Sequence, residues 1–368
     1  MTINSSFKKR PHIVHAINNL GMGGTETICL EIISQFRDWA DNSLLVLDSK
    51  HQPRRGEFEE LNIPITFLNH KPGQYIGLIY KTYLYFRQHP ADGLICWSFG
   101  NHAWISIGAK LAGVKNLIAR AGNAPPYESK QQIKWNYLAH LGFLAGANLV
   151  ACSSYVRERL IKDVRLPTER IEVILNGCNI LDIYQRAKSQ KTNKKKLNNL
   201  VIGMVARLDK IKDHKTLIQA MPMILEEYAN AELWLIGDGE ERENLLKLTQ
   251  SLHLERVVKF LGNRKDIPEL LGQMDLFAFA TTEAEGFGIV LIEALAASIP
   301  VVASDTGPCA EVLQQGKLGI LVPPRDPVSM GKAIVNTLKN PPPKPNLKNL
   351  MSYDTSFIAN LYKTYLFK

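Results

Sequence analysis

Short apolar runs alternate with longer stretches of helical periodicity along the whole chain. Each run is only a few residues long, as expected of strands that are buried on both faces of a parallel sheet. The predicted strands are 12–17, 44–47, 65–68, 94–97, 117–119, 149–152 and 171–175 in the first half, and 201–206, 233–236, 257–261, 276–280, 301–304 and 320–322 in the second. Because helical patterns lie between most of them, the sequence predicts an α/β protein whose parallel sheets carry helices on both faces.

A polar and basic segment separates the two halves. Residues 181–199, LDIYQRAKSQKTNKKKLNN, hold few large apolar side chains and predict an interdomain connection. The 368 residues leave room for two domains of ~150–200 residues each, which we place at 1–180 and 200–352. After the proline-rich spacer 341–345, the segment 353–368 has apolar residues at a spacing of four, and it predicts a final helix that crosses back to the first domain.

Composition places the chain among soluble globular proteins, with 45% hydrophobic and 21% charged residues. The five cysteines are scattered and lack the spacing of a metal site, which favours reduced thiols and a cytoplasmic location. We expect no secretory signal and no membrane-spanning segment, since the longest apolar window is too short. The net charge is +9, but no recognition motif for nucleic acid accompanies it, and we expect no nucleic-acid partner.

The excess of positive over negative charge lies entirely in the first half and the connecting segment. It serves general solubility, or it brings the chain to an anionic substrate or to the inner face of an anionic membrane as a peripheral protein. Residues 127–146 mix Lys130, Lys134 and Tyr137 with apolar residues. They predict a helix that is either half-buried in the domain or amphipathic at a membrane surface.

Polar or glycine-bearing loops follow the predicted strands of the second half, all at one edge of the sheet. They supply candidates for binding a donor substrate: Arg207, Lys212, Gly237, Asn263, Arg264, Glu285 and Glu293. Cationic side chains suit a diphosphate, and carboxylates suit the hydroxyls of a sugar or ribose. The combination predicts a nucleotide-sugar site, and the alternative is that the two cations only neutralise the two glutamates.

The loop after residues 276–280 is the centre of this predicted site. Gly286 and Gly288 flank Phe287 and allow the backbone to approach a ligand closely, and a helix follows from Ile289. Glu293 lies among apolar residues of that helix, where an unpartnered carboxylate would be costly. It must therefore face solvent, pair with a cation or hold ligand hydroxyls.

The first half offers a second group of candidates where its strands end. Gly23 and Gly24 join a strand to a helix, an arrangement in which backbone N–H groups bind phosphate or another oxyanion, or that is only a tight turn. Ligands of open α/β sheets bind at the carboxyl ends of strands. The polar residues at those ends are Ser98, Asn101 and His102 after one strand, and Arg120 and Asn123 after the next.

These motifs, taken together, resemble the family-4 retaining glycosyltransferases of the GT-B fold over essentially the whole chain. The strongest similarity is the Glu-x7-Glu motif formed by Glu285 and Glu293 in EAEGFGIVLIE, followed by MVARLDKIKDHKTLIQA, which contains Arg207 and Lys212. Weaker similarities are GGTE, SSYVRERL, LNG, GDGEER, FLGNRKDIPELL and GILVPPRDP.

The resemblance implies two Rossmann-like domains that face a cleft, the first binding acceptor and the second binding a UDP- or GDP-sugar. It implies that Glu293 holds the ribose, that Glu285 holds the transferred sugar, and that the Gly23–Gly24 loop lies near the donor phosphates. Relatives carry a histidine at the end of the strand at 94–97, and His102 is the nearest histidine to it. We therefore name Glu285, Arg207, Lys212 and His102 as catalytic candidates.

The implied reaction moves a sugar with retention to a hydroxyl of a glycan or lipid-linked acceptor, as in polysaccharide biosynthesis. The sequence contains no Asp-x-Asp motif, so we expect neither a metal-held diphosphate nor another cofactor. The alternatives are a nucleotide-sugar epimerase of the same fold and a relative that binds without catalysis. A nicotinamide dehydrogenase is poorly supported, because the first turn lacks the dinucleotide fingerprint.

Overall fold

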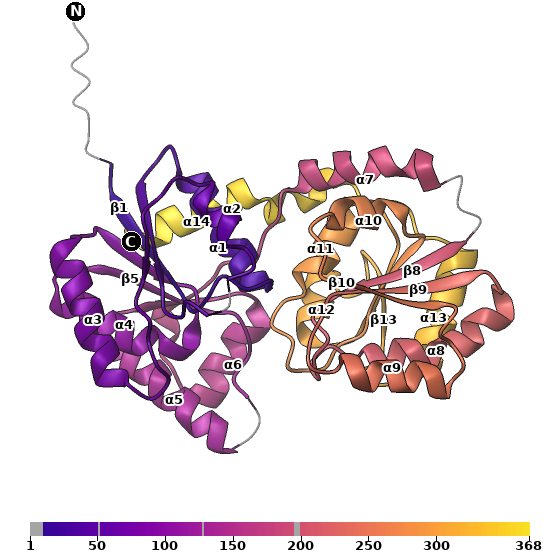
Figure 1. Cartoon of the computed structure of the whole chain (residues 1–368), viewed down its shortest axis with the longest axis horizontal. Coiled ribbons are helices and arrows are strands. Elements are labelled where there is room, and N and C mark those ends of the chain that lie inside the picture. The colour runs from indigo at the N-terminus through magenta and orange to yellow at the C-terminus, as the bar shows by residue number, and fades with distance from the viewer. Residues whose placement is uncertain (1–9, 51, 127–128, 195–198) are drawn as a thin grey trace, which may run out of the picture. The chain divides into compact units, whose positions relative to one another are not determined.

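The computed structural model describes residues 10–50, 52–126, 129–194 and 199–368 (Figure 1). Contacts divide these residues into two compact units. The first contains the chain up to Cys152, residues Arg157–Ile174 and the C-terminal Ile358–Lys368. The second contains Ser153–Val156 and Leu175–Phe357. Each unit is an α/β structure of the kind that the alternation of apolar runs predicts.

The first unit is built on a seven-stranded parallel sheet, within the described residues, in the order β3-β2-β1-β4-β5-β6-β7. Its inner strands are almost fully buried because helices cover both faces, and this explains their short, continuously apolar sequences. The strands are β1 (His12–Ile17), β2 (Asp41–Val46), β3 (Ile65–Phe67), β4 (Gly93–Cys96), β5 (Asn116–Ala121), β6 (Asn148–Ala151) and β7 (Ile171–Val173).

Helices connect these strands in the right order for a doubly wound sheet. The helices are α1 (Gly24–Phe36), α2 (Arg55–Glu59), α3 (Tyr75–Gln88), α4 (His102–Leu111), α5 (Ser129–Leu144) and α6 (Ser154–Val164), with short 3-10 turns at Phe99–Asn101 and Thr168–Arg170. The predicted helix at 127–146 is thus present as α5, and residues 127 and 128 lie outside the described part of the chain.

The C-terminal helix α14 (Thr355–Leu366) joins the first unit, as predicted. Its Tyr362 side chain is buried against Trp97, with ring centroids 5.4 Å apart. The hydroxyl of Tyr365 donates to the carbonyl oxygen of Arg170 at 3.2 Å. The C-terminal helix therefore shares one core with residues far from it in the sequence.

The second unit contains, in its described residues, a six-stranded parallel sheet in the order β10-β9-β8-β11-β12-β13. Its strands are β8 (Leu200–Val205), β9 (Ala231–Ile236), β10 (Val258–Gly262), β11 (Leu276–Phe279), β12 (Val301–Ser304) and β13 (Ile320–Val322). Its helices are α7 (Ile180–Lys194), α8 (His214–Glu227), α9 (Arg242–Ser251), α10 (Ile267–Gln273), α11 (Ile289–Ala296), α12 (Gly307–Val312) and α13 (Pro327–Lys339), and a 3-10 helix η3 (Leu347–Tyr353) follows the proline-rich segment.

The basic segment 181–199, predicted as an interdomain connection, is largely helical. Helix α7 occupies it as far as Lys194, packs against α10 and belongs to the second unit. Arg186 on α7 makes two hydrogen bonds to the Glu269 carboxylate, at 2.7 and 2.8 Å. Residues 195–198 lie outside the described part. The segment is polar because much of α7 faces solvent, and so its helical pattern is weak in the sequence.

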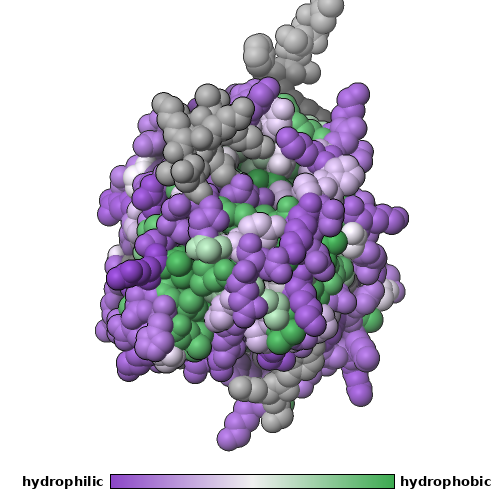
Figure 2. All heavy atoms as spheres, turned by 90° about the vertical axis from the view of Figure 1, so that its right-hand side faces the viewer, coloured by the Kyte–Doolittle hydropathy of each residue, from purple (hydrophilic) through white to green (hydrophobic). Residues whose placement is uncertain are grey.

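The surface of the face drawn in Figure 2 is mostly hydrophilic, with smaller apolar areas between the charged side chains. The five cysteines are buried and none forms a disulfide, as the sequence predicts. Among the described residues, the helices are all too short or too polar to cross a bilayer.

Candidate functional site

The strand order of the second sheet reverses between β8 and β11. The chain runs outward through β9 and β10 on one side, and through β12 and β13 on the other. In open α/β sheets of this order, the loops at such a switch point diverge and leave room for a ligand at the carboxyl ends of the strands. The loops after β8 and β11 carry Arg207, Lys212 and Glu285, so the predicted donor residues lie at this switch point.

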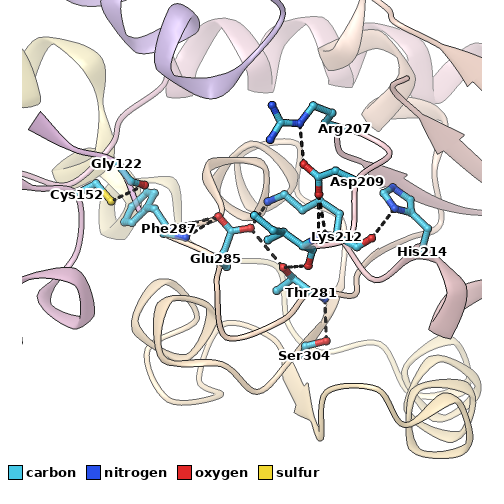
Figure 3. A network of polar contacts seen from close by, with 12 residues as sticks. Gly122, Cys152, Arg207, Asp209, Lys212, His214, Thr281, Glu285, Phe287 and Ser304 are labelled. Atoms are coloured by element: carbon cyan, nitrogen blue, oxygen red, sulfur yellow. Dashed lines mark hydrogen bonds and ion pairs between the residues drawn. The ribbon is translucent and has the colours of Figure 1, made fainter. Parts of the chain in front are cut away.

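Asp209 organises the loop after β8 (Figure 3). One of its carboxylate oxygens accepts hydrogen bonds from the backbone N–H groups of Ile211 and Lys212, at 3.0 and 3.1 Å. Its other oxygen accepts from Nε of Arg207 at 2.7 Å. The carboxylate thus fixes both the turn and the cation, while the Arg207 side chain remains 70% exposed.

Lys212 points to the loop after β11 and pairs with Glu285. The Glu285 side chain is buried, and its second oxygen accepts from the backbone N–H groups of Gly286 and Phe287 at 3.0 and 3.3 Å. Burial by itself raises the pKa of this carboxyl. The charge and hydrogen bond of Lys212 and the two backbone donors outweigh burial and leave the pKa below its ordinary value.

Backbone hydrogen bonds tie the two loops together. The carbonyl oxygen of Ile211 accepts from the Thr282 N–H at 3.0 Å and from the Thr281 hydroxyl at 3.1 Å. The Asp213 N–H in turn donates to the carbonyl oxygen of Ala280 at 3.1 Å. The Lys212 ammonium also lies 4.9 Å from the centre of the Phe279 ring. The site is therefore built on two rigid strand ends rather than on one flexible loop.

A third loop, after β9, packs closely against the first and needs glycine to do so. Gly237 has φ +138°, and a Cβ there would lie 2.0 Å from the carbonyl oxygen of Ala206. Gly288 has φ +79° and forms the N-terminal cap of α11. Both positions need a residue without a side chain. Gly237 therefore supports the loop that carries Arg207, and its predicted contact with a donor stays a prediction.

Residues 153–156 support the loop after β11 from within the second unit. The Ser153 hydroxyl donates to the carbonyl oxygen of Gly286 at 2.9 Å, and the Tyr155 hydroxyl donates to that of Glu283 at 3.2 Å. The Glu311 carboxylate accepts from the backbone N–H groups that begin α6, including that of Ser154 at 2.9 Å. The loop is therefore held on both sides of Glu285.

The remaining donor candidates of the second unit are more loosely placed. Phe287 is buried, and Ile289 begins α11. Glu293 is half-buried in the same helix. Asn263 and Arg264 are exposed after β10, and Arg264 forms two hydrogen bonds to Asp266, at 2.6 and 2.8 Å. Arg264 is thus paired on the surface with a neighbour in its own loop.

The first sheet has its own switch point, between β1 and β4. Asn18, at the end of β1, joins the two loops there. Its backbone N–H donates to the Ser98 hydroxyl at 3.1 Å, and its side-chain oxygen accepts from Asn101 at 3.1 Å. Gly23 is the N-terminal cap of α1 and Gly24 is its first residue, so both lie in the loop after β1. The acceptor candidates Ser98 and Asn101 are therefore brought together at one edge.

His102 does not have the environment of a catalytic residue. Its side chain is fully buried, and Nδ1 bonds to the carbonyl oxygen of Phe99. A Cβ at Gly142 would contact the ring at Nε2. Burial lowers the pKa of His102 to about 4. Substrate therefore has no access to the ring in this structure, and the catalytic role named for His102 stays a prediction.

Arg120 and Asn123, the two candidates that follow in the first unit, differ in their exposure to solvent. Arg120 is buried at the end of β5 and hydrogen-bonds with the Tyr362 side chain of α14, while Asn123 is exposed in the following loop. Arg120 thus anchors the returning helix, and Asn123 is the more accessible acceptor candidate.

The sequence patterns do not predict roles for Asp209, Thr281 and Tyr155, which support the site in the structure. Asp209 could have been found, since an aspartate just after a strand commonly accepts from backbone N–H groups two or three residues on. Thr281 and Tyr155 have no such local signal, because their partners lie 70 and 128 residues away. Among the described residues, no group of three His, Cys, Asp or Glu side chains has an arrangement that could hold a metal ion.

Two family models match the chain. That of the glycosyl transferases group 1 covers residues 185–353, and that of glycosyltransferase family 4 covers residues 22–180. The chain also resembles the solved structure of Anabaena Alr3699/HepE in complex with UDP and glucose, with a TM-score of 0.82, 22% identity and coverage of 98% of this chain and 100% of that one. This similarity shows the GT-B fold.

Two curated relatives are 30% and 31% identical to the chain over shorter aligned spans. An N-acetyl-alpha-D-glucosaminyl L-malate synthase of Bacillus anthracis is 30% identical over 176 residues, which are 47% of this chain and 46% of that protein. An N-acetylgalactosamine-N,N'-diacetylbacillosaminyl-diphospho-undecaprenol 4-alpha-N-acetylgalactosaminyltransferase of Campylobacter jejuni is 31% identical over 184 residues, 50% of this chain and 48% of that protein. The matches thus span about half the length of both relatives.

Proposed function

Because this chain belongs to the group 1, family-4 glycosyltransferases, we propose that it transfers a sugar from a nucleoside-diphosphate sugar to a hydroxyl group of an acceptor. The observation that carries the proposal is the meeting of Arg207, Lys212 and Glu285 at the switch point of the second sheet. A neutral ligand would not need two cations at a strand edge, whereas a diphosphate does.

The donor is a UDP- or GDP-sugar held by the second unit. Arg207 contacts the diphosphate through its exposed guanidinium, and Lys212 is held near it by Glu285. The N-terminus of α11, which follows Gly288, adds backbone N–H groups and a favourable helix dipole. Glu293 accepts hydrogen bonds from the ribose, and Glu285 also orients the transferred sugar.

The acceptor is a hydroxyl of a glycan or of a lipid-linked sugar, as in polysaccharide biosynthesis. The Campylobacter jejuni relative is named for a transfer to a sugar carried on diphospho-undecaprenol, which supports the lipid-linked class. Ser98, Asn101 and Asn123 of the first unit are the acceptor residues, and the backbone of the Gly23–Gly24 loop contributes to binding the donor phosphates. The chain would then work in the cytoplasm, at the inner face of a membrane.

Transfer proceeds with retention and without a metal ion. The bond between the anomeric carbon and the diphosphate oxygen breaks, and its electron pair leaves with the nucleoside diphosphate. The acceptor oxygen bonds to the same face of the anomeric carbon, and its proton passes to the departing diphosphate. Arg207 and Lys212 stabilise the negative charge that develops on the phosphates, which is a preorganised electrostatic effect.

A panel of UDP-, GDP- and ADP-sugars scored by thermal shift tests the donor, since a ligand at 100 times its Kd stabilises by about 2.7 kcal/mol. The selected donor is then incubated with and without acceptor sugars, and the products are separated. Acceptor-dependent glycoside and released nucleoside diphosphate support the proposal. Epimerised donor formed without acceptor would instead identify an epimerase, and binding without any turnover would identify an inactive relative.

A further inference from the structure

Three adjacent helices of the first unit expose apolar side chains that a domain core would normally bury. Ile76 on α3 is 85% exposed and Leu144 on α5 is 82% exposed. The other large exposed residues on these helices include Tyr80, Leu111, Ile133 and Tyr137. Contiguous apolar surface of this kind marks a contact site, whereas single exposed residues do not. We call the outer surface of α3, α4 and α5 the α3–α5 face.

The exposed residues form a continuous surface rather than separate spots. Helix α4 packs against both α3 and α5 (Figure 1). Trp104 of α4 stacks on Tyr75 of α3, with centroids 4.9 Å apart, and also lies 6.4 Å from Tyr137 of α5. A shallow apolar groove of about 460 Å³ runs between α3 and α4, lined by Ile76, Ile79, Tyr80, Tyr83 and Leu111.

The charge on these helices has a single sign. None of the three contains Asp or Glu, although the chain as a whole has 35 such residues. Their basic residues are Lys81, Arg87, Lys110, Lys130 and Lys134, all exposed. On α5, Lys130 and Lys134 flank the exposed Ile133. The face therefore combines apolar area, aromatic rings and positive charge.

We propose that the α3–α5 face docks on the surface of an anionic lipid bilayer. Tyr and Trp are favoured at the boundary between headgroups and acyl chains, and lysine stems can lie along apolar surface while the ammonium reaches a phosphate. Each basic residue near an anionic leaflet adds to the binding energy. A protein partner fits less well, because the buried centres of protein interfaces are depleted in lysine.

This inference goes beyond the proposed transfer reaction and does not depend on it. The sequence predicts a membrane contact for the helix at 127–146 alone, and the structure adds α3 and α4, which are joined to α5 by the aromatic contacts of Trp104. Docking through this face would concentrate the chain where a lipid-linked acceptor is located. Docking of the α3–α5 face on a bilayer would also occur if the protein bound no sugar nucleotide.

The test is co-sedimentation of the full chain with vesicles of phosphatidylcholine alone and with vesicles that also contain phosphatidylglycerol, across a salt series. We expect binding to the anionic vesicles that weakens as salt rises. Lys130→Glu with Lys134→Glu should weaken it by roughly tenfold or more at low salt. Ile76→Ser with Leu111→Ser should weaken vesicle binding by a similar factor at low salt. It should also abolish the vesicle binding that remains at high salt.

Matched controls come from the second unit. Lys247→Glu with Lys332→Glu repeats the charge change at exposed helical positions, and Val328→Ser repeats the apolar change at a residue 49% exposed. These variants should bind vesicles as the unmodified chain does. All variants should keep the circular dichroism spectrum and the cooperative thermal unfolding of the unmodified chain, which separates loss of docking from loss of fold.

Three results would overturn the inference. The first is absence of binding to anionic vesicles at low salt. The second is equal binding by the two face variants and their controls. The third is concentration-dependent self-association, seen by sedimentation velocity, that Ile76→Ser with Leu111→Ser abolishes while vesicle binding stays unchanged, because the face would then pair with a second copy of the chain.

Discussion

The Lys212 ammonium donates to the Glu285 carboxylate across a separation of 73 residues in the sequence. Glu285 is buried and is further held by the backbone N–H groups of Gly286 and Phe287. The pair closes the carboxyl ends of β8 and β11 against each other. The pair therefore helps to set both the conformation of the two loops and the charge of the proposed donor site. A substitution of Lys212 or Glu285 should affect the stability of the fold as well as transfer.

The pH dependence of stability should reveal this pair. The pKa of Glu285 lies below its ordinary value of 4.5 because Lys212 and the backbone donors together outweigh the effect of burial. A carboxylate whose pKa is lowered by folding stabilises the native state fully above its unfolded pKa, and this contribution is lost as the pH falls through the folded pKa. Thermal unfolding of the unmodified chain should therefore show Tm falling steeply below about pH 4.5.

Glu285→Gln should flatten that part of the Tm profile and lower the free energy of unfolding at neutral pH by about 1–3 kcal/mol, because Lys212 and two backbone N–H groups lose an ionised acceptor. The control is Glu283→Gln, which removes a pairing between Arg325 and a carboxylate that is 43% exposed. Such surface pairs contribute ~0–1 kcal/mol. Identical acid profiles for Glu285→Gln and the unmodified chain would show that the buried pair does not set acid stability.

Gly237 and Gly262 both have positive φ but differ in what surrounds them. Their alanine variants should therefore lose different amounts of free energy of unfolding. A Cβ at Gly237 would lie 2.0 Å from a backbone carbonyl oxygen, whereas a Cβ at Gly262 would meet nothing within 4 Å. Gly262→Ala should destabilise by about 1–2 kcal/mol from backbone strain alone. Gly237→Ala should lower the free energy of unfolding by more than Gly262→Ala does, as measured by unfolding in denaturant. It should also weaken sugar-nucleotide binding, because it displaces the loop that carries Arg207. Equal costs for the two variants would contradict the close approach of these loops.

The C-terminal helix should be essential to the first unit. Tyr362 is almost fully buried against Trp97, and its hydroxyl bonds with the buried Arg120. Tyr362→Ala should cost about 3–5 kcal/mol, as for other large aromatic truncations, and Tyr362→Phe about 1–3 kcal/mol. Phe357→Ala, at a half-exposed position before the helix joins the first unit, is the control and should cost less than either. Unfolding in urea measures all three.

Transfer should not need a divalent ion. The proposed site neutralises the diphosphate with Arg207 and Lys212, and the sequence lacks the Asp-x-Asp motif that would hold a metal-bound diphosphate. The rate of nucleoside diphosphate release in the presence of acceptor should be unchanged by EDTA. Activity that is lost in EDTA and restored only by a divalent ion would refute the proposed chemistry, without bearing on the fold.

The sequence predicts the two sheets well because buried parallel strands are encoded locally, as short apolar runs. Each of the predicted strands is present, and no end differs by more than three residues from the prediction. The site residues Lys212 and Glu285 were predictable for a related reason, since loops after neighbouring strands meet at one edge. The C-terminal helix was also predictable from its periodicity and the proline-rich spacer before it.

What the sequence does not predict is burial and the partner of each side chain. His102 follows a strand and has the right chemistry, but packing against Phe99 and Gly142 encloses it. Arg207 is expected opposite the glutamates, yet its partner is Asp209 two residues away. The start of α6 holds the Glu285 loop through contacts over more than a hundred residues. The burial of His102 and the contacts of α6 depend on tertiary packing, for which local patterns carry no signal, whereas Asp209 follows a strand and has a local one.

The central claim is that the loops after β8 and β11 bind the diphosphate of a sugar nucleotide, and calorimetric titration of Arg207→Ala tests it most directly. The titrants are the nucleoside diphosphate selected by the thermal-shift panel and its parent nucleoside. Arg207 is exposed, so the variant should fold normally. We predict a loss of about 1.5–3 kcal/mol in binding the diphosphate and unchanged binding of the nucleoside. Two results would contradict a diphosphate site at these loops. One is equal affinity of Arg207→Ala and the unmodified chain for the nucleoside diphosphate. The other is an equal loss of affinity for the nucleoside diphosphate and for the nucleoside.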